Sequence, residues 1–319
     1  CKNDRKTTWE THPGCYNPSG ASMFLLHGSR MLATRPLQHA IISYNLLAQC
    51  YVDDCYEVDR YEYVPIKWLK KAFRMSSQNA ELQRYNADIY CLQEVELPNF
   101  RADFEPFLSA LNLEVVLQDS KKRKEDHIVG VAVCFRQDRY KLIRQESRSR
   151  SMLVALECLD DSPSRRVLNI LNVHLEGAPE LSDTRFSQLK NSVKILQKWQ
   201  NGPAISKKEP NSDGNGEIEQ VTLVAGDFNC GVESACYKYL VDGRLPAGFI
   251  DRGRKITGET ELVHSLNLVS AYPAASDAKD CTVMFPDWRN RVDFLFHSQQ
   301  VTTTAVMGLK YQEVERLDG

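Results

Sequence analysis

The clearest indication of the fold is in residues 221–231, VTLVAGDFNCG. Four β-branched or apolar residues lead into Ala225 and Gly226, and Asp227 and Asn229 follow at once. This pattern predicts a buried strand that ends at the glycine and places a carboxylate and a carboxamide at its C-terminal end. Because sites in open α/β sheets lie outside the carboxyl ends of the strands, we expect other functional residues to meet there.

Composition excludes some functions. The chain has 40 Lys and Arg against 42 Asp and Glu, a net charge of −2, so nucleic-acid binding must depend on local patches. No apolar run approaches the ~20 residues of a membrane span, so we expect no membrane segment. The ten cysteines are scattered, which favours buried free thiols in a reducing compartment over a disulfide framework or a zinc site. We expect an intracellular, cytoplasmic protein, with an organelle left open.

One domain is expected over residues 39–319, preceded by an N-terminal arm at 1–38. Gly, Pro, Asn and charged residues at 201–219 indicate a flexible insertion within that domain. The order of strands and helices favours an α/β fold of two mixed sheets packed face to face with helices outside. Helical spacing predicts helices at 65–86, 99–112, 180–200, 233–241 and 259–266. In the first of these, we expect an exposed basic face formed by Lys67, Lys70, Lys71 and Arg74.

Polar residues also follow or interrupt other predicted strands. They are Asn45, Glu94, His174 and Asp293. Taken singly, such an aspartate is more often a turn or cap residue, and such a histidine is more often structural. Asp293 is more informative, because a carboxylate between Val292 and Phe294 needs a partner or loses its charge.

Together these residue types suit the cleavage of phosphate esters. Glu94 offers oxygen ligands to a hard cation such as Mg²⁺. Asp227 could deprotonate a water that Asn229 holds in place, and His174 could donate to a phosphate oxygen. Asn45 could hold Glu94, the metal or the phosphate in position. Walker, G-x-S-x-G and H-E-x-x-H motifs are absent from the sequence.

In these residues the chain resembles the endonuclease/exonuclease/phosphatase superfamily, and within it the deadenylase, nocturnin and Angel group. The resemblance extends over about 40–308 and rests on SYNLLAQ (43–49), ADIYCLQEVE (87–96), VAVCF (131–135), YKL (140–142), NVHL (172–175), AGDFN (225–229) and RVDF (291–294), with Arg185 and Gln188. It implies a four-layer αββα sandwich and a phosphoesterase that depends on Mg²⁺ or Mn²⁺. The same roles for Asn45, Glu94, His174, Asp227 and Asn229 are implied.

The chain departs from the family pattern at two places. In the family, a Ser-Asp-His motif follows the position of Asp293, and its histidine is held by that aspartate; here the chain reaches Gly319 first, and we expect a truncated C-terminal end. A base-stacking aromatic residue of the deadenylases aligns with Pro286, so Phe285 and Trp288 beside it are candidates to contact the substrate. Arg185 and Gln188 are also expected to reach the substrate, because they follow His174 closely.

We therefore predict a 3′→5′ exoribonuclease of the deadenylase-like group that acts on poly(A) or other RNA 3′ ends. One alternative is a phosphatase that acts on a nucleotide 2′-phosphate or a cyclic phosphate end. The other is a non-catalytic binding module with a decayed site. Protein partners are left open by the sequence.

Overall fold

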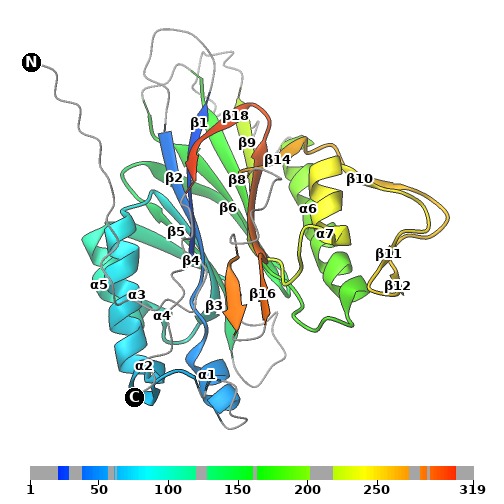
Figure 1. Ribbon diagram of the computed structural model, residues 1–319. Helices are drawn as coiled ribbons and strands as arrows, with labels where there is room; N and C mark the ends of the chain where they lie inside the picture. The colour runs from blue at the N-terminus through cyan, green and yellow to red at the C-terminus, as the bar shows by residue number, and fades with distance from the viewer. Residues whose placement is uncertain are drawn as a thin grey trace, which may run out of the picture.

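Two six-stranded sheets pack face to face, with helices on their outer faces (Figure 1). The structure is a computed structural model that describes residues 21–28, 38–56, 61, 63–119, 128–160, 164–201, 218–272, 281–285 and 288–306. This is the predicted four-layer αββα sandwich. Within the described residues, no helix is both long and apolar enough to cross a membrane.

The first sheet has the strand order β18-β1-β2-β3-β5-β4, where the strands are β1 (Ala21–Gly28), β2 (Gln38–Asn45), β3 (Ile89–Glu96), β4 (Leu113–Leu117), β5 (Val129–Arg136) and β18 (Val301–Val306). The second has the order β14-β17-β9-β8-β7-β6, with β6 (Tyr140–Ser147), β7 (Ser151–Cys158), β8 (Arg166–His174), β9 (Glu219–Asp227), β14 (Leu268–Ser270) and β17 (Asp293–Ser298). Within each sheet one neighbouring pair is parallel, β2 with β3 and β8 with β9, and the other pairs are antiparallel.

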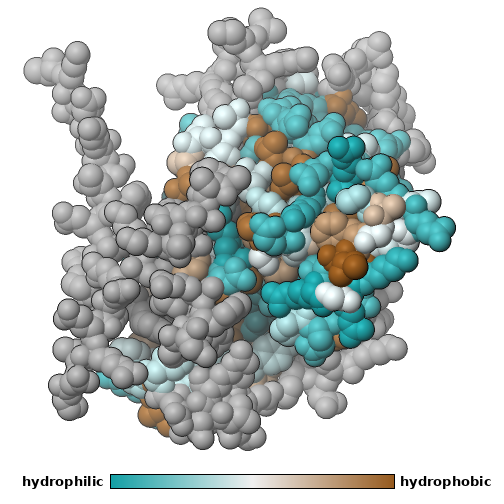
Figure 2. Space-filling view, turned by 45° about the vertical axis from the view of Figure 1, so that its right-hand side comes forward, coloured by the Kyte–Doolittle hydropathy of each residue, from teal (hydrophilic) through white to brown (hydrophobic). Residues whose placement is uncertain are grey.

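The first sheet is flanked by α1 (Gln49–Tyr56), α2 (Ile66–Leu69), α3 (Lys71–Tyr85), α4 (Phe100–Asp103) and α5 (Glu105–Ala110), and the second by α6 (Ser182–Asn201) and α7 (Ala235–Asp242) (Figure 1). Three short strand pairs lie outside the two sheets: β10 (Arg244–Leu245) with β13 (Leu262–Val263), β11 (Ile250–Asp251) with β12 (Arg254–Lys255), and β15 (Val283–Phe285) with β16 (Trp288–Asn290). On the side shown in Figure 2, the described surface is mostly hydrophilic, with separate hydrophobic spots.

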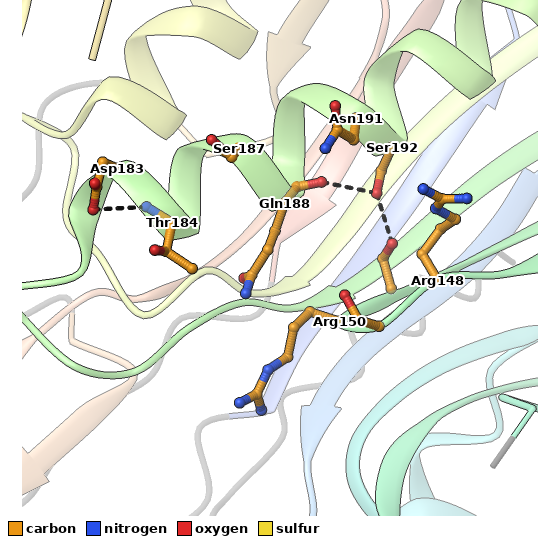
Figure 3. A pocket seen from close by; sticks show the side chains of 10 residues that line it. Arg148, Arg150, Asp183, Thr184, Ser187, Gln188, Asn191 and Ser192 are labelled. Carbon is orange, nitrogen blue, oxygen red and sulfur yellow. Dashed lines mark hydrogen bonds between the residues drawn. The ribbon is translucent and has the colours of Figure 1, made fainter. Parts of the chain in front are cut away.

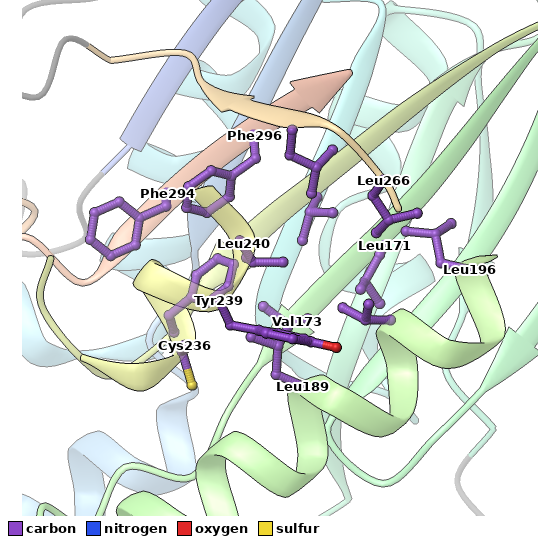
Figure 4. Close-up of a cluster of buried hydrophobic side chains, with 14 of the residues drawn as sticks. Leu171, Val173, Leu189, Leu196, Cys236, Tyr239, Leu240, Leu266, Phe294 and Phe296 are labelled. Carbon is purple, nitrogen blue, oxygen red and sulfur yellow. The ribbon is translucent and has the colours of Figure 1, made fainter. Parts of the chain in front are cut away.

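The alternation of side chains along a strand divides the core into layers. On β8, Leu168 and Ile170 join the cluster between the sheets, while Leu171 and Val173 join the cluster under α6 and α7. Figure 4 shows Leu171 and Val173 among side chains from both helices. A third cluster joins the first sheet to α3, α4 and α5. Because the even-numbered residues of β8 face the other sheet, the strand directs His174 to the same side.

The structure bears on four expectations from the sequence: a helix, the N-terminal arm, the insertion and the cysteines. The helix predicted at 259–266 is wrong, because this segment holds β13, whose residues pair with β10. Within the expected arm at 1–38, residues Ala21–Gly28 form β1 between β2 and β18, so the sheet begins before residue 39. The expected insertion at 201–219 falls largely on 202–217, which lie outside the described residues. Five cysteines are buried free thiols, as predicted for them: Cys91, Cys134, Cys158, Cys230 and Cys236.

Candidate active site

Strand alternation directs most of the predicted site residues into the space between the sheets. His174 and Asp227 are register partners at the ends of β8 and β9, and Asp293 pairs with Asp227 from β17. On β9 and β17, Asp227 and Asp293 have the same parity as Ala225 and Leu295, which belong to the cluster between the sheets. The second sheet therefore presents a histidine and two aspartates side by side at the ends of three adjacent strands.

Glu94 reaches the same space by a local irregularity of the backbone. Tyr90 and Leu92 of β3 face the helices, so a regular strand would turn Glu94 to that face too. Instead the pairing with β5 shifts register between Leu92 and Val95, and Glu94 adopts a left-handed backbone with φ +51°. A bulge of this kind adds one residue to the strand and redirects a side chain, as is common beside active sites. After the bulge, Val95 packs with the helices.

Asn45, at the end of β2, joins the two carboxylates. Its Nδ2 donates to Glu94 Oε1 at 2.9 Å and to Asp227 Oδ2 at 3.0 Å. Its Oδ1 accepts from Leu47 N at 2.8 Å, which fixes the orientation of the carboxamide. His174 Nε2 lies 3.7 Å from Glu94 Oε1 and 4.0 Å from Asp227 Oδ2. Four side chains from four strands and both sheets thus meet at one point.

The electrostatics of this cluster favour a cation. Burial raises the pKa of Glu94, which the hydrogen bonds from Asn45 and Ala48 lower in part. Burial and the charge of Glu94 raise the pKa of Asp227 to about 7, against the hydrogen bond from the Asn229 backbone. The pKa of Asp293 lies well above its usual value because of burial and the neighbouring Asp227. Like charges brought together out of water raise one another's pKa, and a metal ion between them would relieve this cost.

The residues on either side of Asp227 hold its carboxylate in place. Gly226 has φ +137°, and a Cβ at this position would lie 2.0 Å from the carbonyl oxygen of Val173. Asn229 has φ +52°, and its backbone N donates to Asp227 Oδ1 at 2.8 Å. The Asn229 Nδ2 donates to Leu175 O at 2.9 Å, which ties this segment to the one that follows His174.

Arg185 and Gln188 support the site from behind instead of facing it. Arg185 is 1% exposed, and its guanidinium donates to the carbonyls of Glu176 and Ala178 at 2.6 and 2.7 Å. Gln188 Oε1 accepts from Glu176 N at 2.9 Å. Two donors of Arg185 therefore hold the backbone after His174, and its contact with the substrate stays a prediction. Gln188 also lines a separate pocket, described below.

The remaining predicted residues are placed less fully. Phe285 and Trp288 are register partners in the hairpin of β15 and β16, but the positions of their side chains lie outside what the structure describes. Asp293 is 2% exposed, and its backbone N donates to Thr282 Oγ1 at 3.1 Å. Its Oδ1 has no hydrogen-bond partner among the described residues.

Two supports of the site were not predicted. The backbone N of Ala48 donates to Glu94 Oε2 at 3.0 Å, and backbone groups leave no mark in a sequence pattern. Arg74 was expected on an exposed basic face; instead its Nη2 donates to the carbonyls of Leu46 and Leu47. Arg74 therefore steadies the turn that carries Asn45. Lys71 is also engaged, with Asp103 at 2.8 Å and Glu96 at 3.4 Å, while Lys67 and Lys70 are exposed as expected.

Comparison with known proteins agrees with this picture. No protein-family model matches the chain. It is 24% identical over 304 residues to the CCR4-Not complex 3′-5′-exoribonuclease subunit Ccr4 of Candida albicans, covering 84% of this chain and 37% of that protein. It is 25% identical over 239 residues to Protein angel homolog 2 of Danio rerio, covering 71% of this chain and 39% of that protein. The chain spans less than half the length of these curated relatives.

Among solved structures, ANGEL2, a 2′,3′-cyclic phosphatase, in complex with adenosine-2′,3′-vanadate, matches with a TM-score of 0.63 and 20% identity, covering 82% of this chain and 84% of that one. The human Nocturnin catalytic domain matches with a TM-score of 0.53 and 21% identity, covering 81% and 82%. The chain has the endonuclease/exonuclease/phosphatase fold. The resemblance of its motifs to the deadenylase, nocturnin and Angel group of this superfamily is confirmed by these relatives. In this fold, the cluster of Asn45, Glu94, His174 and Asp227 lies where both sheets end together.

Proposed function

We propose that this chain is a metal-dependent hydrolase of RNA phosphodiester bonds that works from the 3′ end, in the manner of a deadenylase. The observation that carries the proposal is the hydrogen bonding of the Asn45 carboxamide to both Glu94 and Asp227. His174 Nε2 lies within 4.0 Å of both carboxylates. A decayed binding module would have no need to keep two largely buried carboxylates and a histidine together, because burying such groups is costly. Exoribonuclease activity is supported by the similarity of this chain to Ccr4 of Candida albicans, a 3′-5′-exoribonuclease subunit.

The donor set fits a divalent metal ion. Glu94, Asp227 and His174 offer ligand atoms within 4.8 Å of one another, and two of these residues are carboxylates with raised pKa values. Carboxylate oxygens suit Mg²⁺ and Mn²⁺. We propose that Glu94 is the main ligand of Mg²⁺, with Mn²⁺ as a substitute. Bound there, the ion would supply positive charge against the reacting phosphate.

The residues around it divide the remaining work. Asp227 accepts a proton from the attacking water, because its carboxylate lies at the end of β9 beside Asn45 and His174. Asn229 fixes the Asp227 carboxylate through its backbone N. His174 donates a hydrogen bond to a phosphate oxygen as charge develops there. We propose that the unsatisfied Oδ1 of Asp293 orients a further donor toward the same phosphate, and that Phe285 or Trp288 stacks on a base.

A second candidate is the hydrolysis of a 2′,3′-cyclic phosphate, or of a nucleotide 2′-phosphate. It draws support from ANGEL2, a 2′,3′-cyclic phosphatase that has the same fold as this chain. The two reactions use the same kind of water attack on phosphorus, so the cluster serves either one.

Product analysis separates the candidates. The chain is incubated with 5′-labelled RNAs that end in oligo(A), in another sequence or in a 2′,3′-cyclic phosphate, and with NADPH, each with Mg²⁺ or with a chelator. Mononucleotides released only with Mg²⁺, together with stepwise shortening of the label, support the exonuclease. A changed end on an RNA of unchanged length, or free phosphate from NADPH, supports the phosphatase. If RNA and NADPH both remain intact with Mg²⁺ and with Mn²⁺, the proposal is wrong.

A further inference from the structure

A polar pocket lies one strand away from the candidate active site. Figure 3 shows it between α6 and the turn that leads into β7, with a volume of about 270 Å³. The turn contributes two arginines, Arg148 and Arg150, and α6 contributes Thr184, Ser187, Gln188 and Asn191. This volume is near the lower end of the range for small-molecule pockets, roughly 300 Å³. Hydroxyl, carboxamide and guanidinium groups in one hollow are typical of a site for an anion.

The pocket lies at the same end of the second sheet as the candidate active site. From β17 to β9 to β8, this edge carries Asp293, Asp227 and His174 in register. The next strand is β7, where Ser151 pairs with Val173 and the carbonyl of Arg150 accepts from His174 N at 2.9 Å. Neighbouring strands are about 4.8 Å apart. Along this end of the sheet, the side chains therefore change from acidic on β17 and β9 to basic in the turn before β7.

The arginines differ in how they are held. Arg150 lies 3.4 Å from the Glu176 carboxylate, and in Figure 3 its side chain points away from α6. Among the described residues, no carboxylate pairs with Arg148, and this residue is exposed. The acidic group that lines the pocket, Asp183, accepts from the backbone N of Thr184 at 2.9 Å in the first turn of α6. Among the residues that the structure describes, Arg148 is thus a cation without a counter-ion.

We propose that this pocket binds a second phosphate group of the substrate, next to the phosphate that reacts at the cluster of Asn45, Glu94, His174 and Asp227. The inference rests on the proposed function, because it needs a substrate with more than one phosphate. The Arg148 guanidinium can bind phosphate through paired hydrogen bonds, and Gln188 and Thr184 add neutral donors. With a net charge of −2, the chain has no global attraction for RNA, so a local basic pocket of this kind is what RNA binding requires.

The test compares substrates with one and two phosphodiester groups. An RNA dinucleotide offers only the reacting linkage, while a trinucleotide offers a second one, which can be made neutral as a methylphosphonate. The variant is Arg148→Gln, and the matched control is Arg244→Gln, whose side chain is 69% exposed on β10 away from the pocket. Binding is measured by a fluorescent label in the presence of chelator, and hydrolysis is measured with Mg²⁺.

We expect Arg148→Gln to weaken trinucleotide binding about tenfold and to raise its KM by a similar factor, with the dinucleotide unchanged. The methylphosphonate should weaken binding to the unmodified chain equally and should cost Arg148→Gln nothing further. Arg244→Gln should match the unmodified chain. Equal affinity of Arg148→Gln and the unmodified chain for the trinucleotide, or equal losses on both substrates, would overturn the second-phosphate site. Absence of hydrolysis by the unmodified chain would overturn the proposed function alone, since the binding comparison is made without turnover.

Discussion

The carboxamide of Asn45 offers the sharpest test of the site's geometry. Replacing it by alanine removes the two donors that bridge Glu94 Oε1 at 2.9 Å and Asp227 Oδ2 at 3.0 Å. It also frees Leu47 N, which donates to Asn45 Oδ1. A hydrogen bond to a charged group contributes about 1.5–3 kcal/mol. If water replaces one of the two bonds, losing the other corresponds to a fall in kcat/KM of roughly 10- to 200-fold.

The assay is the initial rate of RNA hydrolysis with saturating Mg²⁺, alongside urea unfolding to show that the variant folds. Asn45→Asp has the same shape and serves as the comparison, because it places a third carboxylate between the other two. We expect it to lose more activity than Asn45→Ala, since a like charge raises the pKa of Asp227 further. If Asn45→Ala keeps kcat/KM within about twofold of the unmodified chain, the bridge has no part in catalysis and the reasoning fails.

Two further predictions concern stability. Gly226→Ala should lower the free energy of unfolding by about 3 kcal/mol or more, because its Cβ would lie 2.0 Å from Val173 O. The control is Gly248→Ala, at φ +69° with no atom within 4 Å, which should lower the free energy of unfolding by only about 1–2 kcal/mol. Equal losses for the two variants in urea unfolding would show that the contact with Val173 is unimportant. Burial and the charge of Arg139 lower the pKa of His39 to about 4, so the unfolded chain takes up a proton first as pH falls. The contribution of His39 to the free energy of unfolding is fully present above pH 6.5 and should fall by roughly 1–3 kcal/mol toward pH 4. His39→Gln should reduce this dependence of stability on pH. The same pH dependence in the variant would disprove the role of His39.

Much of the fold was open to prediction because its central strands are short apolar runs that end at polar residues. The run from Val221 to Asp227 predicted a buried strand, and β9 occupies the centre of its sheet. His174 and Asp227 were predicted at strand ends for the same reason, and they are register partners. A segment with weak periodicity, 259–266, was assigned wrongly, because its few apolar residues fit a helix as well as the short β13.

The parts that could not be predicted depend on contacts between distant segments. Glu94 follows a strand pattern, yet only the bulge opposite β5 turns it toward Asn45. Arg74 has the spacing of an exposed helical residue, but the turn at 46–47 comes to lie against it. Arg185 follows His174 closely in sequence, but the direction of α6 brings its guanidinium to the carbonyl of Glu176. No local pattern carries this information.

The most direct test of the account is the rate of RNA hydrolysis by Glu94→Gln with Mg²⁺. Glu96→Gln is the matched control, because Glu96 lies two residues away and contacts Lys71 and the Cys50 backbone outside the cluster. We expect Glu94→Gln to fold normally and to lose at least about a thousandfold in rate, while Glu96→Gln keeps most of its activity. A Glu94→Gln rate close to that of the unmodified chain would contradict the claim that Glu94 serves the reaction together with Asn45, His174 and Asp227.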